Sequence, residues 1–402
     1  MSTKAYLEKD VFNATCQRLE YILSEFPKVY MSFSGGKDSS VLLQLLIQIA
    51  EKMNKLPVNV MYIDFEAQYK ATIHHVEEML LDKRVNAYWI CLPMNLRNSV
   101  SVYASQWQCW NPNEKEKWVR EMPDYQCVIK SEKFFPFWRY GMEFEEFIIH
   151  FAKWFSNGEK TACLVAIRAN ESLNRFRTIK NMKKERYYNL GYSTKIDEGI
   201  YNFYPIYDWC TEDIWTAVGK FGFKYNKVYD LMYMQGKTIH QCRLCQPYGD
   251  DQRKGLELFR VCEPQTWGKV VDRVSGANYG NLYANTLLLA TRKMILPEGH
   301  SWKSYTKFLL QTLPDYEREW YLTKFKVFFD WWAKHGYPED LVPDFADCKF
   351  EEARKVPSWR RLAQVILKND KICKHLSFGG TKGQFAKYNE LREKYEQERI
   401  SE

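Results

Sequence analysis

The chain has 402 residues, of which 46% are hydrophobic and 27% are charged, a balance that is ordinary for globular proteins. This length favours two domains over a single core. No stretch of the sequence carries the roughly 18 apolar residues that a membrane-spanning helix needs, which argues against a membrane protein. The formal net charge of +8 favours polyanionic ligands, and a nucleotide, a nucleic acid and an acidic partner protein all stay open.

The N-terminus and the cysteine content indicate the compartment. Residues Met1 to Lys4 run into a charged, helix-like segment that lacks the apolar core of a signal peptide. The 11 cysteines are an odd number scattered along the chain, which fits a reducing compartment better than a disulfide framework. We therefore expect a soluble, cytoplasmic protein.

A helix over 10–26 and a short strand over 28–33 are the first predicted elements. Apolar residues at helical spacing indicate the helix, Pro27 ends it, and the strand is rich in β-formers such as Val29 and Tyr30. A second helix, from about Val41 to Met53, follows a polar turn. That turn consists of Ser34, Gly35, Gly36, Lys37, Asp38 and Ser39.

This turn, the glycine loop, is expected to bind an anion. Its two glycines allow backbone angles that point successive N–H groups into one concavity, and the N-terminus of the next helix adds partial positive charge. Lys37 can add a point charge, and the hydroxyls of Ser34 and Ser39 can donate to phosphate oxygens. Asp38 is unusual in an anion site, which suggests that it acts on a metal ion or on backbone amides. The alternative is a turn that merely links a strand to a helix.

A near-continuous apolar run over 58–63 predicts a second, buried parallel strand. Asp64 follows at its carboxyl end and Glu66 lies two residues later, at the edge where open α/β sheets bind ligands. A contact with a ribose hydroxyl or a magnesium ion and a solvated loop acid are equally compatible with this position. A helix around 72–81 and a strand around 85–91 continue the alternation of a doubly wound sheet.

Residues 103–140 interrupt this alternation with an aromatic insertion. The segment carries Trp107, Trp110, Trp118 and Trp138, and it is punctuated by prolines. Two interpretations stay open. The insertion is either a lid that stacks on a base or a hydrophobic mini-core.

A helix over 143–155 and a buried strand over 162–167 resume the pattern. Polar residues follow that strand directly, at the expected ligand edge. They are Arg168, Glu171, Ser172 and Arg175, and the run stays basic through Arg177, Lys180, Lys183, Lys184 and Arg186. Guanidinium groups suit bidentate contacts with phosphate or sulfate, so an anion-binding function is favoured over a solvated basic loop.

A strand over 203–209 and a helix over 211–221 close the predicted sheet domain. Cys242 and Cys245 then form a C-x-x-C pair, with Cys262 downstream. A zinc or iron–sulfur site usually needs four ligands, and spacing alone does not supply the fourth. Buried or incidental thiols are the alternative. Beyond residue 261 the spacing predicts helices over 279–295, 302–313, 315–334 and 358–367 and a charged tail over 382–402.

Three stretches resemble one known family. The glycine loop, with Phe33 before it, matches the S-G-G-x-D-S signature of the PP-loop ATP pyrophosphatases, in the form found in phosphoadenosine phosphosulfate (PAPS) reductases. The run 167–175 resembles the second signature of the PAPS reductases, in which arginines face the anionic end of the substrate. The run 224–230 resembles the Y-N-x-x-Y-D pattern that closes the same domain, so the resemblance covers about 27–235.

The resemblance implies an α/β fold of the adenine nucleotide α-hydrolase type, with a doubly wound, mainly parallel sheet. It implies binding of ATP or a PAPS-like adenine nucleotide, with magnesium as counterion, and cleavage between the α and β phosphates. Carried onto this chain, the catalytic residues would be Lys37, Asp38 and Arg168, and magnesium would bind Asp38 and Asp64. The nucleotide-binding set would be the glycine loop together with Asp64, Arg168, Glu171, Ser172 and Arg175.

The whole-chain arrangement divides into 1–235, with its insertion over about 103–140, and a mainly helical domain over 236–402. Together with the turn at 249–254, it is similar to the immunoglobulin-binding regulator A group of PAPS-reductase-like proteins. The cysteine nucleophile of true PAPS reductases lies in an E-C-G-x-H segment, and neither Cys348 nor Cys373 has that context.

Three hypotheses follow. The protein is an enzyme that activates a substrate with ATP or acts on a PAPS-like nucleotide in sulfur metabolism, a nucleic-acid-directed modification enzyme, or a non-catalytic regulator that works with a partner protein.

Overall fold

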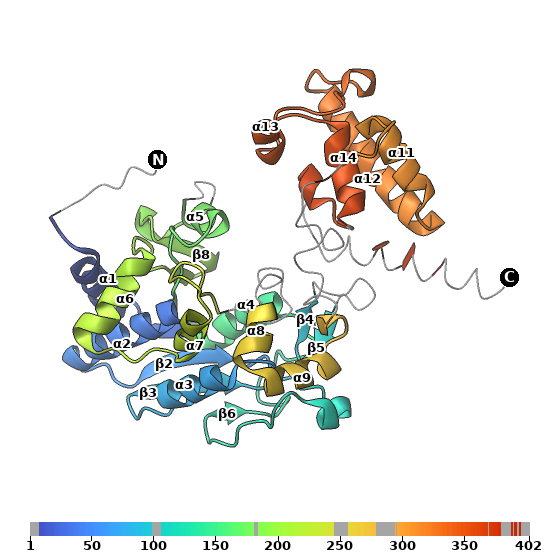
Figure 1. Ribbon diagram of the computed structural model, residues 1–402. Coiled ribbons are helices and arrows are strands. Elements are labelled where there is room, and N and C mark those ends of the chain that lie inside the picture. The colour runs from blue at the N-terminus through green and yellow to red at the C-terminus, as the bar shows by residue number, and fades with distance from the viewer. Residues whose placement is uncertain are drawn as a thin grey trace. The chain divides into compact units, whose positions relative to one another are not determined.

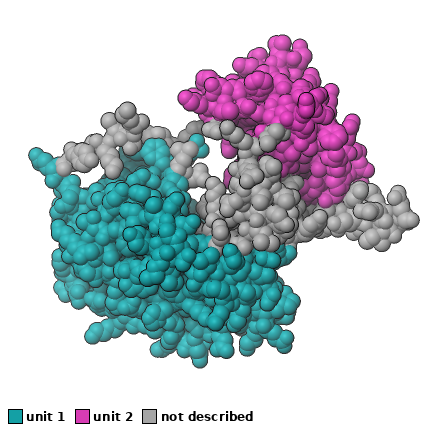
Figure 2. All heavy atoms as spheres, viewed as in Figure 1, with its two compact units in different colours: residues 1–281 teal, residues 282–402 magenta. Residues whose placement is uncertain are grey.

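Two compact units make up the chain, residues 1–281 and 282–402 (Figure 2). The computed structural model describes residues 8–98, 106–180, 184–244, 256–278, 294, 296–368, 370–378, 387, 388, 390, 391 and 394. The expected boundary after residue 235 differs from this division. Helices α8 (Leu256–Cys262) and α9 (Pro264–Arg273) belong to the first unit, because Phe259 and Trp267 pack into the core of the sheet.

A seven-stranded sheet forms the centre of the first unit, in the order β6-β3-β2-β1-β7-β9-β8 (Figure 1). All neighbouring strands are parallel except β8 and β9, which confirms the predicted mainly parallel α/β class. The strands are β1 (Lys28–Phe33), β2 (Val58–Ile63), β3 (Val85–Ile90), β6 (Val128–Ile129), β7 (Thr161–Val165), β8 (Ser193–Asp197) and β9 (Ile200–Phe203).

Helices cover both faces of this sheet (Figure 1). Tyr30 of β1 and Tyr88 of β3 contact Phe151 of α4 on one face. Phe33 points to the other face, because it lies three positions after Tyr30 and alternate residues of a strand face opposite sides, and there it contacts His75 of α3. The helices are α1 (Val11–Glu25), α2 (Lys37–Lys52), α3 (Lys70–Leu80), α4 (Phe144–Ser156), α5 (Leu173–Lys180), α6 (Thr211–Phe221) and α7 (Val228–Met234).

The strand order reverses between β1 and β7. Strands β2, β3 and β6 follow β1 on one side, while β7 lies on the other and pairs with β1 up to Ser32 and Val165. The loops that leave these two strands therefore emerge side by side at the same edge. In open α/β sheets this reversal point is where ligands bind.

One predicted strand is wrong. The segment over 203–209 was expected to be a strand, but β9 ends at Phe203 and the chain turns through 204–207. The hairpin partner β8 was not predicted. Its sequence, Ser193–Asp197, is polar and sits at the sheet edge, so it lacks the apolar run that marks a buried strand.

The aromatic insertion packs onto the sheet unit rather than standing free. Within its described part, β5 (Gln106–Gln108) pairs with β4 (Asn95–Arg97), and β6 extends the main sheet beside β3. Trp107 and Trp110 are buried, with exposed fractions of 8% and 1%. These positions favour the hydrophobic mini-core over the base-stacking lid.

A buried ion-pair network fastens this insertion to the end of β2. Asp64 pairs with Arg120 of the insertion, and Glu66 pairs with Arg273 of α9 at 2.9 Å between Oε1 and Nε. Both carboxylates are fully buried, and Glu66 Oε2 also accepts a hydrogen bond from the Trp110 amide at 2.7 Å. The acids that follow β2 thus join three segments that are distant in sequence.

The second unit is helical and has a core of its own, in which Tyr321 and Leu362 are fully buried. The predicted helices over 302–313, 315–334 and 358–367 are confirmed, whereas 279–295, apart from position 294, and most of the tail lie outside the described residues. None of the described helices in either unit has the length and apolar character needed to cross a bilayer. The helices here are α11 (Trp302–Gln311), α12 (Asp315–Ala333), α13 (Cys348–Glu352) and α14 (Trp359–Leu367).

Replacing Glu66 with Gln should lower the free energy of unfolding by about 3–5 kcal/mol, because it leaves the buried Arg273 without its main counterion. Glu114 pairs with the same arginine at 2.8 Å but is 36% exposed, so Glu114→Gln is the matched control and should cost less than about 1 kcal/mol. Urea unfolding of both variants measures the difference. Equal losses of unfolding free energy in the two variants would contradict the claim that burial of the Glu66 carboxylate makes its ion pair the more important one.

Candidate functional site

The glycine loop joins β1 to α2 through one residue in the left-handed region. Gly35 has a φ of +71°, and Gly36 is the N-cap of α2. The loop is held from behind by Asn226, whose Nδ2 donates to the Gly35 carbonyl and to Thr72 Oγ1 of α3, both at 2.9 Å. A Cβ at Gly35 would approach Val76 and Thr72 to 3.1 and 3.2 Å. The loop thus fits closely against α3.

The two serines of the loop bind each other in this structure. Ser34 Oγ and Ser39 Oγ lie 3.0 Å apart, and Ser39 Oγ donates to the Gly36 carbonyl at 3.0 Å. The two hydroxyls that were predicted to contact phosphate therefore lie next to each other. Their predicted contacts with phosphate stay a prediction.

Lys37 is enclosed by the chain itself and is only 5% exposed. Its backbone N–H donates to the Tyr229 hydroxyl at 3.0 Å, and its Nζ lies 3.4 Å from the Cys242 carbonyl oxygen and 3.4 Å from Asp38 Oδ2. The first amide of α2 thus already points at an oxygen acceptor. A protein oxygen thus binds the amide to which a phosphate oxygen was predicted to bind, and phosphate binding at this helix N-terminus stays a prediction.

Arg168 reaches the glycine loop from the adjacent strand β7. Its Nε donates to Asp38 Oδ1 at 2.5 Å, so Asp38 bridges the guanidinium group of Arg168 and the ammonium group of Lys37. Arg168 is 2% exposed, and its Nη1 has no hydrogen-bond partner among the described residues. A buried guanidinium nitrogen without an acceptor is costly, and an anionic ligand would satisfy it. The sequence predicted that Arg168 and the glycine loop lie at the same edge of the sheet, and the structure brings them into contact.

The other residues predicted around Arg168 serve a different local purpose. Ser172 Oγ accepts a hydrogen bond from the Arg175 amide at 3.2 Å, and Glu171 pairs with Arg175 at 3.7 Å, so these three form the start of α5. The Glu171 carbonyl also accepts from Arg243 Nη2 at 2.6 Å. Among the described contacts, none joins these three residues to the glycine loop, and their nucleotide contacts stay a prediction.

Asp64 lies at the same sheet edge, but both oxygens of its carboxylate already bind other groups of the protein. Its carboxylate pairs with Arg120, accepts from Trp89 Nε1 at 2.9 Å and accepts from the Glu66 amide at 3.0 Å. Asp38 is likewise neutralised by two cations. In this arrangement the two carboxylates fit a magnesium ion poorly, so the predicted magnesium site gains no support from the described contacts.

The predicted zinc or iron–sulfur site is only partly visible. Cys242 is 3% exposed, and burial raises the pKa of its thiol although Lys37 nearby lowers it. Cys245 lies outside the described residues. No group of three potential ligands close enough to hold a metal ion occurs within the described ranges. The metal site stays a prediction.

Sequence reasoning missed several residues that shape the loop. Tyr229 and Asn226 belong to a stretch whose resemblance was noted, but spacing gave no sign that they contact the glycine loop 190 residues away. Thr72 and His75 lie on α3 and carried no motif at all. Only the fold brings these side chains to the back of the loop.

His75 supports the helix that follows the loop. Its Nε2 lies 2.7 Å from Ser40 Oγ, which in turn donates to the Gly36 carbonyl at 2.9 Å. The ring is 2% exposed, and burial lowers the pKa of His75 to about 4. The imidazole is therefore neutral at pH 7, and the contact adds no charge beside the candidate anion site.

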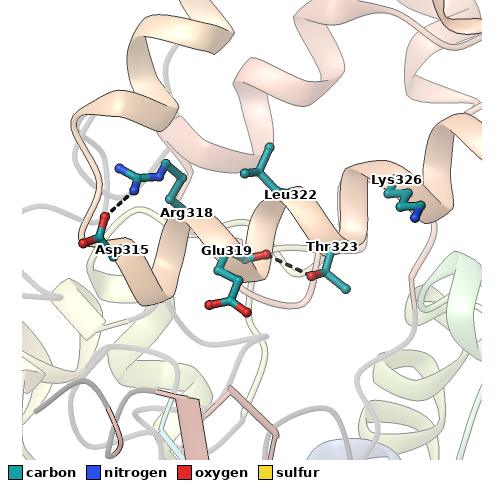
Figure 3. A pocket seen from close by; sticks show the side chains of 6 residues that line it. All are labelled: Asp315, Arg318, Glu319, Leu322, Thr323 and Lys326. Carbon is teal, nitrogen blue, oxygen red and sulfur yellow. Dashed lines mark hydrogen bonds and ion pairs between the residues drawn. The ribbon is translucent and has the colours of Figure 1, made fainter. Parts of the chain in front are cut away.

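One depression described on the surface lies away from this site. A groove of about 390 Å³ runs along α12 in the second unit and is open to solvent (Figure 3). All six lining residues come from that single helix, so it is a feature of the helix surface rather than an enclosed pocket. They are Asp315, Arg318, Glu319, Leu322, Thr323 and Lys326, and none belongs to the predicted site.

The Gly35→Ala variant should lose about 1–3 kcal/mol of unfolding free energy, because an alanine at positive φ is strained and its Cβ would crowd Val76. Gly219 provides the control, since a Cβ there meets no atom within 4 Å and its helical position favours alanine by roughly 0.5–1 kcal/mol. Chemical denaturation of both variants measures the effect. A neutral Gly35→Ala variant would show that the loop is not held tightly.

His75 should make the protein less stable as the pH falls from 6.5 towards 4. The unfolded chain binds the proton at the higher pKa of 6.5, so protonation favours unfolding across that window, by up to roughly 3 kcal/mol at pH 4. His75→Gln should reduce this pH dependence, whereas His74→Gln, an 83% exposed neighbour, should not. Urea unfolding at a series of pH values measures it, and identical profiles for wild type and His75→Gln would refute the assignment.

Two family models match the chain, and their matches meet between residues 235 and 236. Residues 28–235, more than half of the chain, match the family model of the phosphoadenosine phosphosulfate reductase domain. Residues 236–344 and 339–387 match a domain of unknown function (DUF3440). An uncharacterized protein of Escherichia coli strain K12, YbdN, is 38% identical over 397 residues, covering 96% of this chain and 95% of that protein.

Solved structures give weaker similarities. The phosphoadenylyl-sulfate reductase of Candida auris, in a phosphate complex, aligns with 57% of this chain and 94% of its own at 13% identity and a TM-score of 0.31. The FMN adenylyltransferase of Candida glabrata aligns with 56% of this chain and 62% of its own at 15% identity and a TM-score of 0.32. These matches do not confirm the resemblance to the immunoglobulin-binding regulator A group. On its sequence matches, the chain belongs to the phosphoadenosine phosphosulfate reductase domain family.

Proposed function

We propose that this protein binds ATP or a PAPS-like adenine nucleotide at the glycine loop and cleaves ATP between its α and β phosphates. The observation that carries the proposal is the buried, unpartnered Nη1 of Arg168 beside the N-terminus of α2. A phosphate group there would satisfy this donor and would meet the positive end of the helix dipole. Membership of the family supports an adenine nucleotide as the carrier of that phosphate.

The proposed reaction transfers an adenylyl group. An oxygen nucleophile on an acceptor, or water, attacks the α phosphorus, and the bond from that phosphorus to the bridging oxygen breaks. Pyrophosphate leaves with the electron pair, AMP stays on the acceptor, and the proton of the nucleophile passes to solvent. Lys37 and Arg168 would stabilise the charge that develops on the leaving pyrophosphate.

Asp38 would have a positioning role in this site. By binding both cations, it holds Lys37 and Arg168 at fixed distances before the nucleotide arrives. Pre-ordered cations lose less side-chain entropy on binding than mobile ones. The predicted role of Asp38 as a magnesium ligand would require it to release one of them.

A second candidate function is nucleotide-dependent regulation without turnover. It is favoured by the enclosure of Lys37, because a phosphate must displace the Tyr229 hydroxyl from the Lys37 amide and the Cys242 carbonyl from Nζ. Binding would then move α7 and the segment that follows it. A protein that changes conformation in this way can signal to a partner without hydrolysing the ligand.

Replacing Arg168 with Lys should weaken ATP binding by roughly 10- to 100-fold, because lysine cannot bind Asp38 and a phosphate in the two directions that a guanidinium group offers. Isothermal titration with ATP measures binding, and an assay of pyrophosphate and AMP measures turnover. Arg84→Lys is the control, since Arg84 also pairs with a carboxylate, Asp82 at 2.7 Å, away from the loop.

The possible outcomes separate the two candidate functions. Loss of binding and of pyrophosphate release in Arg168→Lys, with both retained in Arg84→Lys, supports the adenylylating enzyme. Binding without release in the wild-type protein, with any acceptor tested, supports the regulator. Unchanged ATP binding in Arg168→Lys would exclude the proposed site.

A further inference from the structure

The surface that begins at α5 combines positive charge with exposed aromatic rings. From 173 to 188 the sequence holds six cations, at positions 175, 177, 180, 183, 184 and 186, against the single anion Glu185. Within the described part of the chain, Arg177, Lys180 and Lys184 are exposed and have no ion-pair partner. Uncompensated cations in such a run attract a polyanion.

Two aromatic side chains are exposed within this run. Phe176 is 43% exposed and Tyr188 is 77% exposed, whereas the neighbouring Tyr187 is 5% exposed. The backbone at Tyr188 is left-handed, with a φ of +41°, which is unfavourable for an aromatic residue. The Tyr188 ring packs edge-on against the buried Tyr187 ring, 4.5 Å between centroids, so it is held in place while most of its surface stays exposed.

Three of these side chains lie on one side of α5, and the segment that carries the others is bonded to the end of that helix. On α5, Phe176, Arg177 and Lys180 fall within about 100° of arc, since successive residues are rotated by about 100°. The later segment is tied to the end of this helix, because Arg186 Nη2 donates to the Ile179 carbonyl at 3.0 Å. We define the α5 surface as Phe176, Arg177, Lys180, Lys184, Arg186 and Tyr188.

We propose that the α5 surface binds single-stranded nucleic acid. Arg177, Lys180 and Lys184, which have no ion-pair partner among the described residues, can neutralise phosphates, and exposed rings can stack on unpaired bases. A duplex would use the charges but not the rings, because its bases are already stacked. An acidic protein surface would also pair with the cations, but its carboxylates, unlike unpaired bases, present no flat ring that stacks on Phe176 and Tyr188.

The position of this surface connects it with the candidate active site. The start of α5 lies only five residues after Arg168, whose carbonyl accepts from the Glu171 amide at 3.2 Å. A strand bound along α5 would therefore approach the nucleotide from the β7 side. That the nucleic acid accepts the adenylyl group is a claim that rests on the proposed function. That it binds the α5 surface does not depend on the proposed function.

The charge part of the proposal is tested with the full-length chain and a fluorescently labelled 20-nucleotide single-stranded RNA. Fluorescence anisotropy between 50 and 200 mM NaCl gives the slope of log K against log salt concentration, which is about −0.7 for each neutralised phosphate. The triple variant Arg177→Ala, Lys180→Ala, Lys184→Ala should flatten this slope by about 2. The control removes three exposed lysines elsewhere on the same unit, Lys52, Lys83 and Lys220, and should keep the wild-type slope.

The stacking part needs a different readout. Phe176→Ala with Tyr188→Ala should weaken RNA binding by about tenfold or more without changing the salt slope, because no charge is removed. Tyr233→Ala is the matched control, since Tyr233 is 68% exposed on α7. Ultraviolet crosslinking followed by mass spectrometry should place the RNA on peptides that contain residues 176 and 188.

Several results would overturn the proposal. Equal flattening of the slope by the control lysines would show a general charge effect, and tighter binding of a 20-base-pair duplex would show that the rings are not used. Crosslinks confined to other peptides would exclude the α5 surface. RNA binding without pyrophosphate release would support the α5 surface and refute only the adenylylating reaction. Pyrophosphate release without RNA binding would refute only the α5 surface.

Discussion

The bridge that Asp38 makes between Lys37 and Arg168 is the interaction on which the rest of the site depends. Two buried cations at the N-terminus of a helix would repel each other and the helix dipole, so one carboxylate between them makes their proximity tolerable. The three groups still carry one net positive charge. That surplus, with a guanidinium nitrogen that lacks an acceptor among the described residues, is what supports the proposed anion site.

This bridge exists only because of the strand order. Strands β1 and β7 are more than a hundred residues apart in sequence, but they pair in parallel where the winding of the sheet reverses, so their following loops meet. The residues at the carboxyl end of the neighbouring strand, β2, have a structural role instead. There Asp64 and Glu66 are buried in ion pairs that hold the insertion and α9. At the ends of β1 and β7 a guanidinium nitrogen of Arg168 lacks an acceptor among the described residues, whereas the carboxylates after β2 are fully paired within the protein.

The fit of the glycine loop against its supports explains how such a site stays in place without ligand. Asn226 binds the Gly35 carbonyl and links it to Thr72, and His75 binds the loop through Ser40. Tyr229 and the carbonyl of Cys242 cover it from the front. Oxygen atoms of the protein therefore occupy positions that phosphate oxygens would take, which links ligand binding to movement of the segment from α7 onward.

Sequence alone determined the first two parallel strands, the glycine loop between strand and helix, and the expectation that Arg168 would reach the same edge. Buried parallel strands appear as continuous apolar runs and a glycine turn before a helix is a local pattern, so neither needs tertiary information. Sequence could not reveal that the carboxylate of Asp64 is consumed by Arg120, or that Tyr229 caps the helix amide. Those contacts join residues that are distant along the chain, and whether a charged group is neutralised or available depends on which partner the fold brings within hydrogen-bonding distance.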